Sequence, residues 1–283
     1  MKGVSPCLHG DMPLDKREEQ MNYRQNYVPA ERQQKIIEYI RQHGSAQIKE
    51  LSEMLFVSEA TVRRDLDELH LSGSLERTHG GAIYRRQGTS FERRYEEKMT
   101  LMEAEKREIA TEALKEISPG DTLFLDSGTT SYFLGRALGG IPDLTVFTYD
   151  LMVAYSCELH PSSTITITGG TRRQGHNNVL LGMQAVDFIR GLKVDKVFLG
   201  ADAVDLSCVS NSNVPEAEIK KVAVEAGESV YLLIDHTKIG QRALAKVCTL
   251  DCIDTLITDR GILPEHLAEM KKSIGRVSVT KER

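Results

Sequence analysis

The stretch VSEATVRRDL, residues 57–66, indicates how the first part of the chain folds. Ser58 is a preferred N-cap residue, because its hydroxyl oxygen accepts a hydrogen bond from a free N–H group of the first helical turn. Valines flank this cap at the spacing of a hydrophobic staple. Val62, Leu66 and Leu69 then follow at helical spacing. The sequence therefore predicts a helix that is capped by Ser58 and buries these three apolar side chains.

Two more helices are predicted upstream of this one. Isoleucines at helical spacing follow Pro29, and Gly44 suits the stop that commonly ends a helix. A shorter pattern then places Ile48, Leu51 and Leu55 on one face, which predicts a second helix.

Downstream of the third helix the sequence indicates a β-hairpin. Gly73 ends the helix, and strand-like runs at residues 74–78 and 82–85 flank His79-Gly80-Gly81. Gly-Gly is a turn signal between two strands. The first part of the chain therefore reads as three helices followed by a hairpin.

The predicted third helix has a surface suited to DNA. With its apolar stripe turned inward, small and hydroxyl residues and two arginines remain for its other faces. An arginine fork can pair with guanine O6 and N7 in the major groove, and side-chain methyl groups can meet a thymine methyl. The hairpin would lie on the DNA backbone as a wing. The predicted DNA contacts are Ser58, Glu59, Ala60, Thr61, Arg63, Arg64, Arg77 and His79.

The spacing alone leaves a plainer interpretation open, in which the helices are a packing module and the arginines a solvated face. Acidic residues such as Glu59, Asp65 and Asp67 balance the arginines, so local charge does not favour nucleic acid. Asp65 and Asp67 are also candidates to hold arginine side chains in place.

The stretch 57–66, with Arg32 upstream and His79-Gly80-Gly81 downstream, resembles the winged helix-turn-helix of DeoR-family bacterial transcriptional regulators over residues 29–84. The run Phe91-Glu92-Arg93-Arg94, followed by a helix that contains Lys106, is also similar to that family. The resemblance implies that double-stranded operator DNA is a partner. Because most members of the family are repressors, it also implies a repressor of a carbohydrate-metabolism operon.

The sequence pattern changes after a predicted helix at residues 101–117. From there on, short β-rich runs alternate with helical segments. This alternation is typical of βαβ units and predicts a largely parallel sheet. The predicted strands cover residues 122–126, 144–148, 164–168, 196–201, 229–235, 255–259 and 276–279.

The first of these strands leads into a candidate phosphate site. Glycine lets the backbone approach a ligand closely, hydroxyls donate hydrogen bonds, and a helix N-terminus offers free N–H groups to an anion. A Ser/Thr-rich helix cap without any ligand would look the same, so the motif leaves both interpretations open. The residues of this predicted cradle are Asp126, Ser127, Gly128, Thr129 and Thr130.

Further polar motifs follow the carboxyl ends of other predicted strands. Because open α/β sheets bind ligands at this edge, their convergence favours a polyhydroxylated, phosphorylated ligand. Lys238 can supply a charge for the phosphate, and Asp202 and Asp205 can accept hydrogen bonds from sugar hydroxyls. The additional predicted effector contacts are Gly169, Gly170, Asp202, Asp205, Asp235 and Lys238.

Residues 106–279 resemble the DeoR effector domain, which is similar in fold to ribose-5-phosphate isomerase. Residues 127–130, 200–205 and 235–238 match, in order, the phosphate loop, the sugar-site motif and the phosphate-approaching motif of those isomerases. The enzymes then carry a Lys-Gly-Gly-Gly run and a glutamate base, where this chain has residues 206–213 instead.

This departure concerns catalysis. Glu216 and Glu218 are candidate bases, but no lysine partner is evident where the enzymes have one, and proton shuttling needs both. The resemblance therefore implies that binding is retained and catalysis lost, with no catalytic residue expected. The alternative is a sugar-phosphate isomerase with an accessory helical domain. Ser207–Asn213 is the predicted specificity loop.

The fold prediction is thus an α/β protein with an N-terminal winged helix-turn-helix joined to a largely parallel, sugar-phosphate-binding domain. The expected organisation is a disordered tail at 1–28, the DNA-binding domain at 29–86, a linker at 87–105 and the effector domain at 106–283. A homo-oligomer, dimer or tetramer, would set two recognition helices on operator half-sites.

Composition agrees with a globular chain without membrane spans. Hydrophobic residues make up 40% of the 283 residues, and no apolar run approaches the roughly 18 residues that a span requires. Five scattered cysteines favour the reducing cytoplasm, and we expect no cofactor. Cys248 and Cys252 approach a metal-binding spacing but are interpreted as buried thiols, so no metal is expected. The net charge of −5 means that DNA binding must rest on a few well-placed arginines.

Overall fold

The computed structural model describes residues 27–71, 74–83, 88–173 and 178–281. The chain divides into two compact units, Met1–Arg85 (unit 1) and Arg86–Arg283 (unit 2). Nearly all of the predicted tail lies outside the described residues, as does Gly73, the predicted helix stop.

Unit 1 is built from helices and a small antiparallel sheet. Its elements are α2 (Pro29–His43), β1 (Ser45–Gln47), α3 (Ile48–Leu55), α4 (Glu59–Leu71), β2 (Glu76–Thr78) and β3 (Gly81–Ile83). The strand order is β1-β3-β2. The predicted helices and hairpin are confirmed, whereas β1 was not predicted, because three residues are too short to carry a strand pattern.

The apolar stripes of the three helices meet in one core. Val62, Leu66 and Leu69 are at most 4% exposed, as the helical spacing predicted. Packing requires a glycine at position 81, because a Cβ there would lie 2.0 Å from the carbonyl oxygen of Ala46 in β1. The core consists of Ile36, Ile40, Ala46, Ile48, Leu51, Leu55, Val62, Leu66, Leu69, Leu75 and Ala82.

Unit 2 is centred on a seven-stranded sheet with the order β15-β14-β12-β9-β4-β5-β6, and every neighbouring pair is parallel. The strands are β4 (Thr122–Leu125), β5 (Thr145–Thr148), β6 (Thr164–Ile167), β9 (Val194–Leu199), β12 (Gly227–Leu233), β14 (Thr255–Thr258) and β15 (Arg276–Val279). Each corresponds to one predicted run, so the predicted parallel α/β fold is confirmed.

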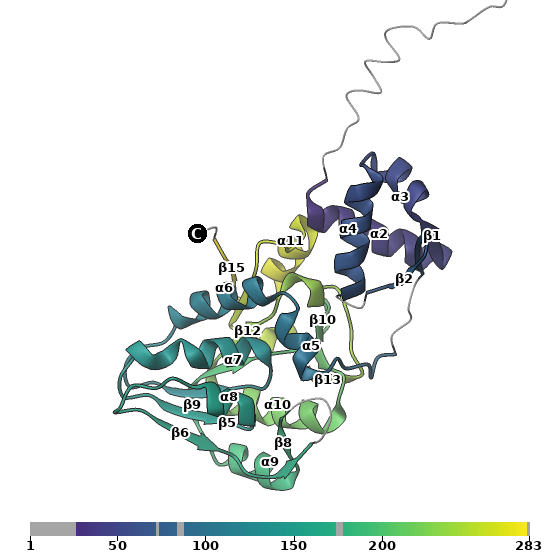
Figure 1. Ribbon diagram of the computed structural model, residues 1–283. Helices are drawn as coiled ribbons and strands as arrows, with labels where there is room; N and C mark the ends of the chain where they lie inside the picture. Colours follow the sequence, from purple (N-terminus) through teal and green to yellow (C-terminus); the bar gives the residue numbers. More distant parts are fainter. Residues whose placement is uncertain (1–26, 72–73, 84–87, 174–177, 282–283) are drawn as a thin grey trace, which may run out of the picture. The chain divides into compact units, whose positions relative to one another are not determined.

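Helices cover both faces of this sheet (Figure 1). Strand side chains alternate between two cores: Phe124 faces one, whereas Leu123 and Leu125 face the other. The first core also contains residues of α9 (Met183–Arg190), α10 (Val214–Ala226) and α11 (Pro264–Ser273). The second contains residues of α6 (Glu103–Leu114), α7 (Thr129–Arg136) and α8 (Leu151–Ser156).

Smaller elements complete unit 2. Two antiparallel sheets are formed by β10 (Ala203–Val204), β11 (Val209–Asn211) and β13 (Ala245–Cys248), and by β7 (Thr171–Arg172) and β8 (Leu180–Leu181). Short 3-10 helices are η1 (Leu138–Gly140), η2 (His236–Lys238) and η3 (Leu250–Cys252). Within the described residues, no helix is both long and apolar enough to span a membrane.

Three local expectations need correction. The polar linker contains a helix, α5 (Tyr95–Thr100), whose first residue is buried. Within the predicted specificity loop, residues 209–211 form strand β11, and Ser210 and Asn211 are at most 2% exposed. Of the two thiols predicted to be buried, Cys248 is buried but Cys252 is exposed.

The strand order also marks a special point at the carboxyl edge of the sheet. From β4 the chain proceeds through β5 to β6 on one side, and then returns to β9 and proceeds through β12 to β15 on the other. The direction of winding therefore reverses between β4 and β9. In open α/β sheets, ligands bind where the strand order reverses.

Candidate functional site

Helix α4 exposes the surface that was predicted to contact DNA. Ser58 caps it as expected: its Oγ accepts a hydrogen bond from the Thr61 N–H at 3.1 Å and lies 2.8 Å from Thr61 Oγ1. This cap fixes where the helix starts and therefore which side chains its first turns present. Among the predicted DNA contacts, Thr61 and Arg77 are half-buried, and the exposed residues are Ser58, Glu59, Ala60, Arg63, Arg64 and His79.

The two arginines of this surface differ in their partners. Arg63 donates to Glu59 Oε2 at 3.0 Å, and about half of each side chain is exposed. An exposed pair of this kind contributes little, so Arg63 can exchange Glu59 for DNA at low cost. Arg64 is exposed and makes no hydrogen bond or ion pair with another residue in the described part of the chain. Its guanidinium is therefore available to a base edge.

Two acidic residues of α4 hold arginines, as the sequence suggested. Asp65 is 1% exposed and forms an ion pair with Arg32 of α2, which also donates to it through a second nitrogen at 2.8 Å. Asp67 accepts from Arg77 Nε at 2.9 Å, and Arg77 also donates to the Gly81 carbonyl at 3.0 Å. Arg77 therefore ties the hairpin to α4, in addition to its predicted role as a DNA contact.

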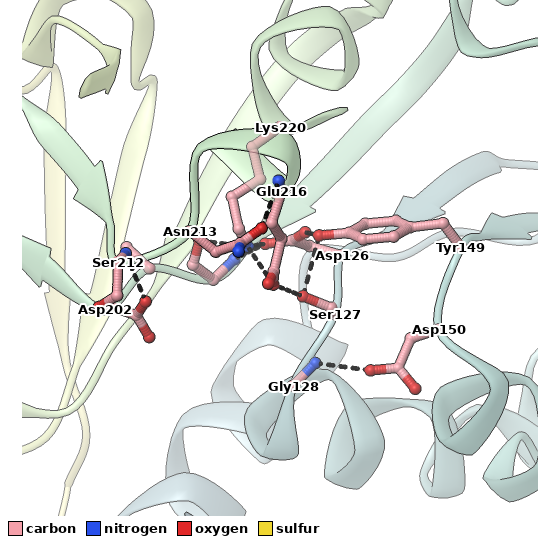
Figure 2. Close-up of polar contacts among 12 residues, drawn as sticks. Asp126, Ser127, Gly128, Tyr149, Asp150, Asp202, Ser212, Asn213, Glu216 and Lys220 are labelled. Atoms are coloured by element: carbon pink, nitrogen blue, oxygen red, sulfur yellow. Dashed lines mark hydrogen bonds and ion pairs between the residues drawn. The ribbon is translucent and has the colours of Figure 1, made fainter. Parts of the chain in front are cut away.

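In unit 2, the predicted phosphate cradle lies where the strand order reverses. Figure 2 shows three of its residues, Asp126, Ser127 and Gly128. Asp126 follows β4, and its Oδ2 accepts from the Gly200 N–H, just after β9, at 2.6 Å. Gly128 has a φ of +107° and leads into α7, whose first-turn N–H groups lack partners within the helix. The Thr129 and Thr130 hydroxyls make no hydrogen bond to other described residues. The loop can therefore offer both N–H and hydroxyl donors to an anion.

A buried polar network lies directly behind this loop. The Tyr149 hydroxyl donates to Asp126 Oδ1 at 2.7 Å and lies 2.9 Å from Ser127 Oγ. The Ser127 hydroxyl donates to Glu216 Oε1 at 2.6 Å (Figure 2). Lys220 donates to Asp126 and lies 4.0 Å from Glu216. All five side chains are less than a tenth exposed, so this buried network holds the predicted cradle, residues 126–130, in place.

Glu216 has a lysine neighbour at a position that the isomerase resemblance does not indicate. Lys220 is four residues further along α10, a spacing that places the two side chains on one helix face. Burial raises the pKa of Glu216, although the charge of Lys220 opposes the rise. Burial would favour a neutral amine at Lys220, but Asp126 and Glu216 raise its pKa, so it stays charged.

Asp150 is a second residue of this site that was not predicted. Its Oδ2 accepts from the Gly128 N–H at 3.1 Å, and its Oδ1 caps α8 by accepting from the N–H groups of Met152 and Val153. Asp150 is fully buried, and burial raises its pKa against the effect of these hydrogen bonds. It therefore accepts a hydrogen bond from one N–H of the cradle loop (residues 126–130) and links that loop to the end of β5.

The remaining charged residues gather on the other side of the reversal point. Lys238 donates to the Ala201 carbonyl at 2.8 Å. Burial lowers the pKa of its ammonium, and the charges of Asp235 and Asp202 oppose this effect. Asp202 accepts from the Ser212 N–H at 2.8 Å. Burial would raise the pKa of Asp202, but lysines hold it at about 2, so the group is ionised. The structure thus brings together Lys238, Asp202 and Asp235 as predicted.

Two family models match this chain along most of its length. The DeoR-like helix-turn-helix domain matches residues 32–87, and the DeoR C-terminal sensor domain matches residues 102–260. The second match covers more than half of the chain. The chain belongs to the DeoR family.

Curated relatives agree with this assignment. The HTH-type transcriptional regulator GlpR of Haloferax volcanii is 34% identical over 88% of this chain and 96% of its own length. The lactose phosphotransferase system repressor of Lactococcus lactis is 32% identical over 85% and 95% of the two chains. The glycerol-3-phosphate regulon repressor of Escherichia coli is 30% identical over 79% and 88%. This DeoR protein is therefore a helix-turn-helix transcriptional regulator rather than an enzyme.

A solved structure provides a weaker likeness. Ribose 5-phosphate isomerase A of Methanocaldococcus jannaschii is 18% identical over 49% of this chain, with a TM-score of 0.35. This chain covers 55% of that enzyme. At this TM-score the two structures share too little of their backbone to support an inference about function in either direction.

Some predicted effector contacts of this DeoR chain have structural partners. Asp205 accepts from the Ser207 N–H at 2.8 Å and from the Cys208 N–H at 2.9 Å, which shapes the turn between β10 and β11. At Gly170 a Cβ would lie 2.7 Å from the Leu181 carbonyl oxygen, and its φ is +122°. Glycine is thus required there by the approach of β8, whether or not a ligand binds.

Proposed function

We propose that this protein represses a carbohydrate-metabolism operon and that a phosphorylated sugar, bound in unit 2, controls its affinity for operator DNA. One observation carries the proposal: a loop with N–H and hydroxyl donors lies at the reversal point of a parallel sheet, and the half-buried Lys238 is hydrogen-bonded to the neighbouring strand end at Ala201. The relatives include repressors of a lactose phosphotransferase system and of a glycerol-3-phosphate regulon, which supports the same class of ligand.

The proposed binding mode divides the ligand between two sets of residues. The phosphate accepts hydrogen bonds from the first turn of α7 and from the hydroxyls of Thr129 and Thr130, while Lys238 supplies positive charge. Asp202 and Asp235 are ionised and accept hydrogen bonds from sugar hydroxyls. The predicted effector residues thus act together at one edge of the sheet.

The proposed DNA-binding mode places the exposed residues of α4 in the major groove. Arg64 pairs with a guanine, and His79 at the hairpin tip lies against the DNA backbone. The protein acts in the cytoplasm as a homo-oligomer, so that two copies of α4 meet two operator half-sites. The sugar phosphate regulates binding only if it has different affinities for the DNA-bound and DNA-free arrangements.

The Lys238→Met and Thr129→Ala variants test the phosphate site. We expect each to bind a sugar phosphate roughly ten-fold more weakly, because a charge-assisted or hydroxyl hydrogen bond is lost, while DNA binding without the sugar phosphate is unchanged. The measurement is a thermal-shift titration with a panel of pentose and hexose phosphates, since a bound ligand raises the melting temperature.

The matched control is Lys246→Met, which changes an exposed lysine of β13. It should respond to every compound as the wild-type protein does. If the Lys238→Met protein also responds normally, then the phosphate does not lie beside this lysine and the proposed site is wrong.

A further inference from the structure

The segment that joins the two units contributes side chains to the candidate effector site. Its start is attached to unit 2, because the Leu244 N–H donates to the Thr89 carbonyl at 2.9 Å. Helix α5 follows within this segment, which we call the linker (residues 88–100). Glu92 pairs with Arg173, Lys98 lies near Asp202, and the charge of Asp150 acts on Tyr95. Residue 86 is the first residue of unit 2, so this segment directly follows the DNA-binding unit along the chain.

Glu92 lies at the centre of a chain of alternating charges. Its side chain is 3% exposed and accepts from Lys98 at 3.1 Å and from Arg173 at 2.6 Å. Lys98 also lies 3.6 Å from Asp202, and Arg173 lies 3.8 Å from Glu216. A single carboxylate of the linker is therefore connected, through one cation on each side, to two acidic residues of the site.

Lys98 is the cation that an effector can reach. Lys98 lies against Asp202, and the charge of Lys238 also acts on Asp202, so both lysines surround the same carboxylate. In the proposed binding mode, a phosphate beside Lys238 would lie near Asp202 and its partner Lys98, where it would compete with Glu92 for this lysine. A phosphate dianion carries more charge than a carboxylate, which favours the exchange.

Tyr95 provides an independent sign of a missing partner. Its side chain is 6% exposed, and its buried hydroxyl makes no hydrogen bond within the described residues. Helix α5 packs against α7, the helix that begins at the cradle loop. Burial raises the pKa of Tyr95, and the charge of Asp150 raises it further. Asp150 binds the Gly128 N–H of the cradle loop. A buried hydroxyl without a partner is costly, and here it lies beside the loop proposed to bind phosphate.

We propose that the linker forms part of the effector site: Tyr95 hydrogen-bonds the bound sugar phosphate, and the phosphate draws Lys98 away from Glu92. This inference rests on the proposed function and adds to it a direct route to the DNA-binding unit. Ligand binding breaks an ion pair within the segment that follows that unit, so occupancy of the site changes the restraint on the linker.

The first test is Tyr95→Phe, which removes one oxygen and leaves the ring in place. Without ligand, we expect the melting temperature to stay the same or rise, because an unpartnered buried hydroxyl is removed. With the compound that most stabilises the wild-type protein in a panel of inorganic phosphate, glycerol 3-phosphate, and pentose and hexose phosphates, we expect binding about five-fold weaker. If Tyr95 had only a structural role, its replacement would not weaken ligand binding while leaving the melting temperature without ligand unchanged or higher.

The second test is Glu92→Gln. Without ligand, its melting temperature should fall, because Lys98 and Arg173 lose their shared carboxylate. The same probe compound should bind about ten-fold more tightly, since it no longer competes with Glu92 for Lys98. Loss of a purely structural ion pair would lower the melting temperature equally with and without the probe. Glu96→Gln, which changes an exposed carboxylate of the neighbouring helix α5, is the matched control and should leave both quantities unchanged.

The outcomes separate this inference from the proposed function. If no compound of the panel stabilises the wild-type protein, the proposed sugar-phosphate site is wrong, and the role of the linker in it fails as well. If the wild-type protein is stabilised but both variants bind the probe with wild-type affinity, only the linker inference is overturned. Weaker binding by Tyr95→Phe together with tighter binding by Glu92→Gln supports it.

Discussion

Replacing Arg64 with alanine should abolish the gel shift of the DNA fragment upstream of this protein's own coding region, without changing the melting temperature. Arg64 is exposed and has no partner in the described part of the chain, so its loss costs the fold nothing. In the proposed complex it contacts a base directly, and a contact of this kind contributes about 1–3 kcal/mol per half-site. Two half-sites in a dimer double the effect, which corresponds to roughly 30-fold or more in affinity.

Two further variants sharpen this prediction. Arg63→Ala should weaken binding less, because Arg63 must first give up its hydrogen bond with Glu59. Arg136→Ala removes a half-exposed arginine of unit 2 and should leave the gel shift intact. An unchanged gel shift for the Arg64→Ala protein would mean that α4 does not present this residue to DNA.

Replacing Lys220 with methionine should have the largest effect on stability. The ammonium is 2% exposed and lies between the buried carboxylates of Asp126 and Glu216. Removing one partner of a buried ion pair leaves an uncompensated charge, which typically costs about 3–5 kcal/mol. We therefore expect the free energy of unfolding of unit 2, measured by urea denaturation, to fall by about that amount.

The next residue in the chain provides a matched control. Lys221 pairs with Glu218 on the exposed side of α10, and Lys221→Met should change stability by less than about 1 kcal/mol. Adding Asp126→Asn to Lys220→Met should recover part of the lost stability, because one unpaired charge is then removed. Equal stabilities of the Lys220→Met and Lys221→Met proteins would contradict the buried network.

The fold was predictable because its patterns are local. The alternation of short β-rich runs with helical segments identified every strand of the large sheet, and the stripe of Val62, Leu66 and Leu69 identified α4. Strand β1 and helix α5 were not predicted, because they are short and their conformation depends on neighbours that are distant in sequence. β1, for example, forms by pairing with β3, and its Ala46 lies against Gly81.

The site was predictable where a motif ends a strand and unpredictable where residues meet across the fold. The cradle loop and Lys238 follow strand ends, so their convergence could be inferred from the parallel sheet. Tyr149 and Asp150 also follow a strand, β5, but no phosphate motif distinguishes them. Glu92 and Lys98 stand in a segment whose polar composition predicts an exposed linker, and only the ion pairs with Arg173 and Asp202 reveal their place.

The winding of the sheet has a consequence for the order in which the chain acquires structure during synthesis. The central strand β4 pairs with β9, and β9 in turn with β12, so the middle of the sheet cannot close until about residue 233 has been made. Unit 1 completes its core within residues 36–82 and needs none of these strands. Local contacts form faster than parallel strand pairs. A ribosome-bound chain therefore holds a finished DNA-binding module before it holds anything able to sense a sugar.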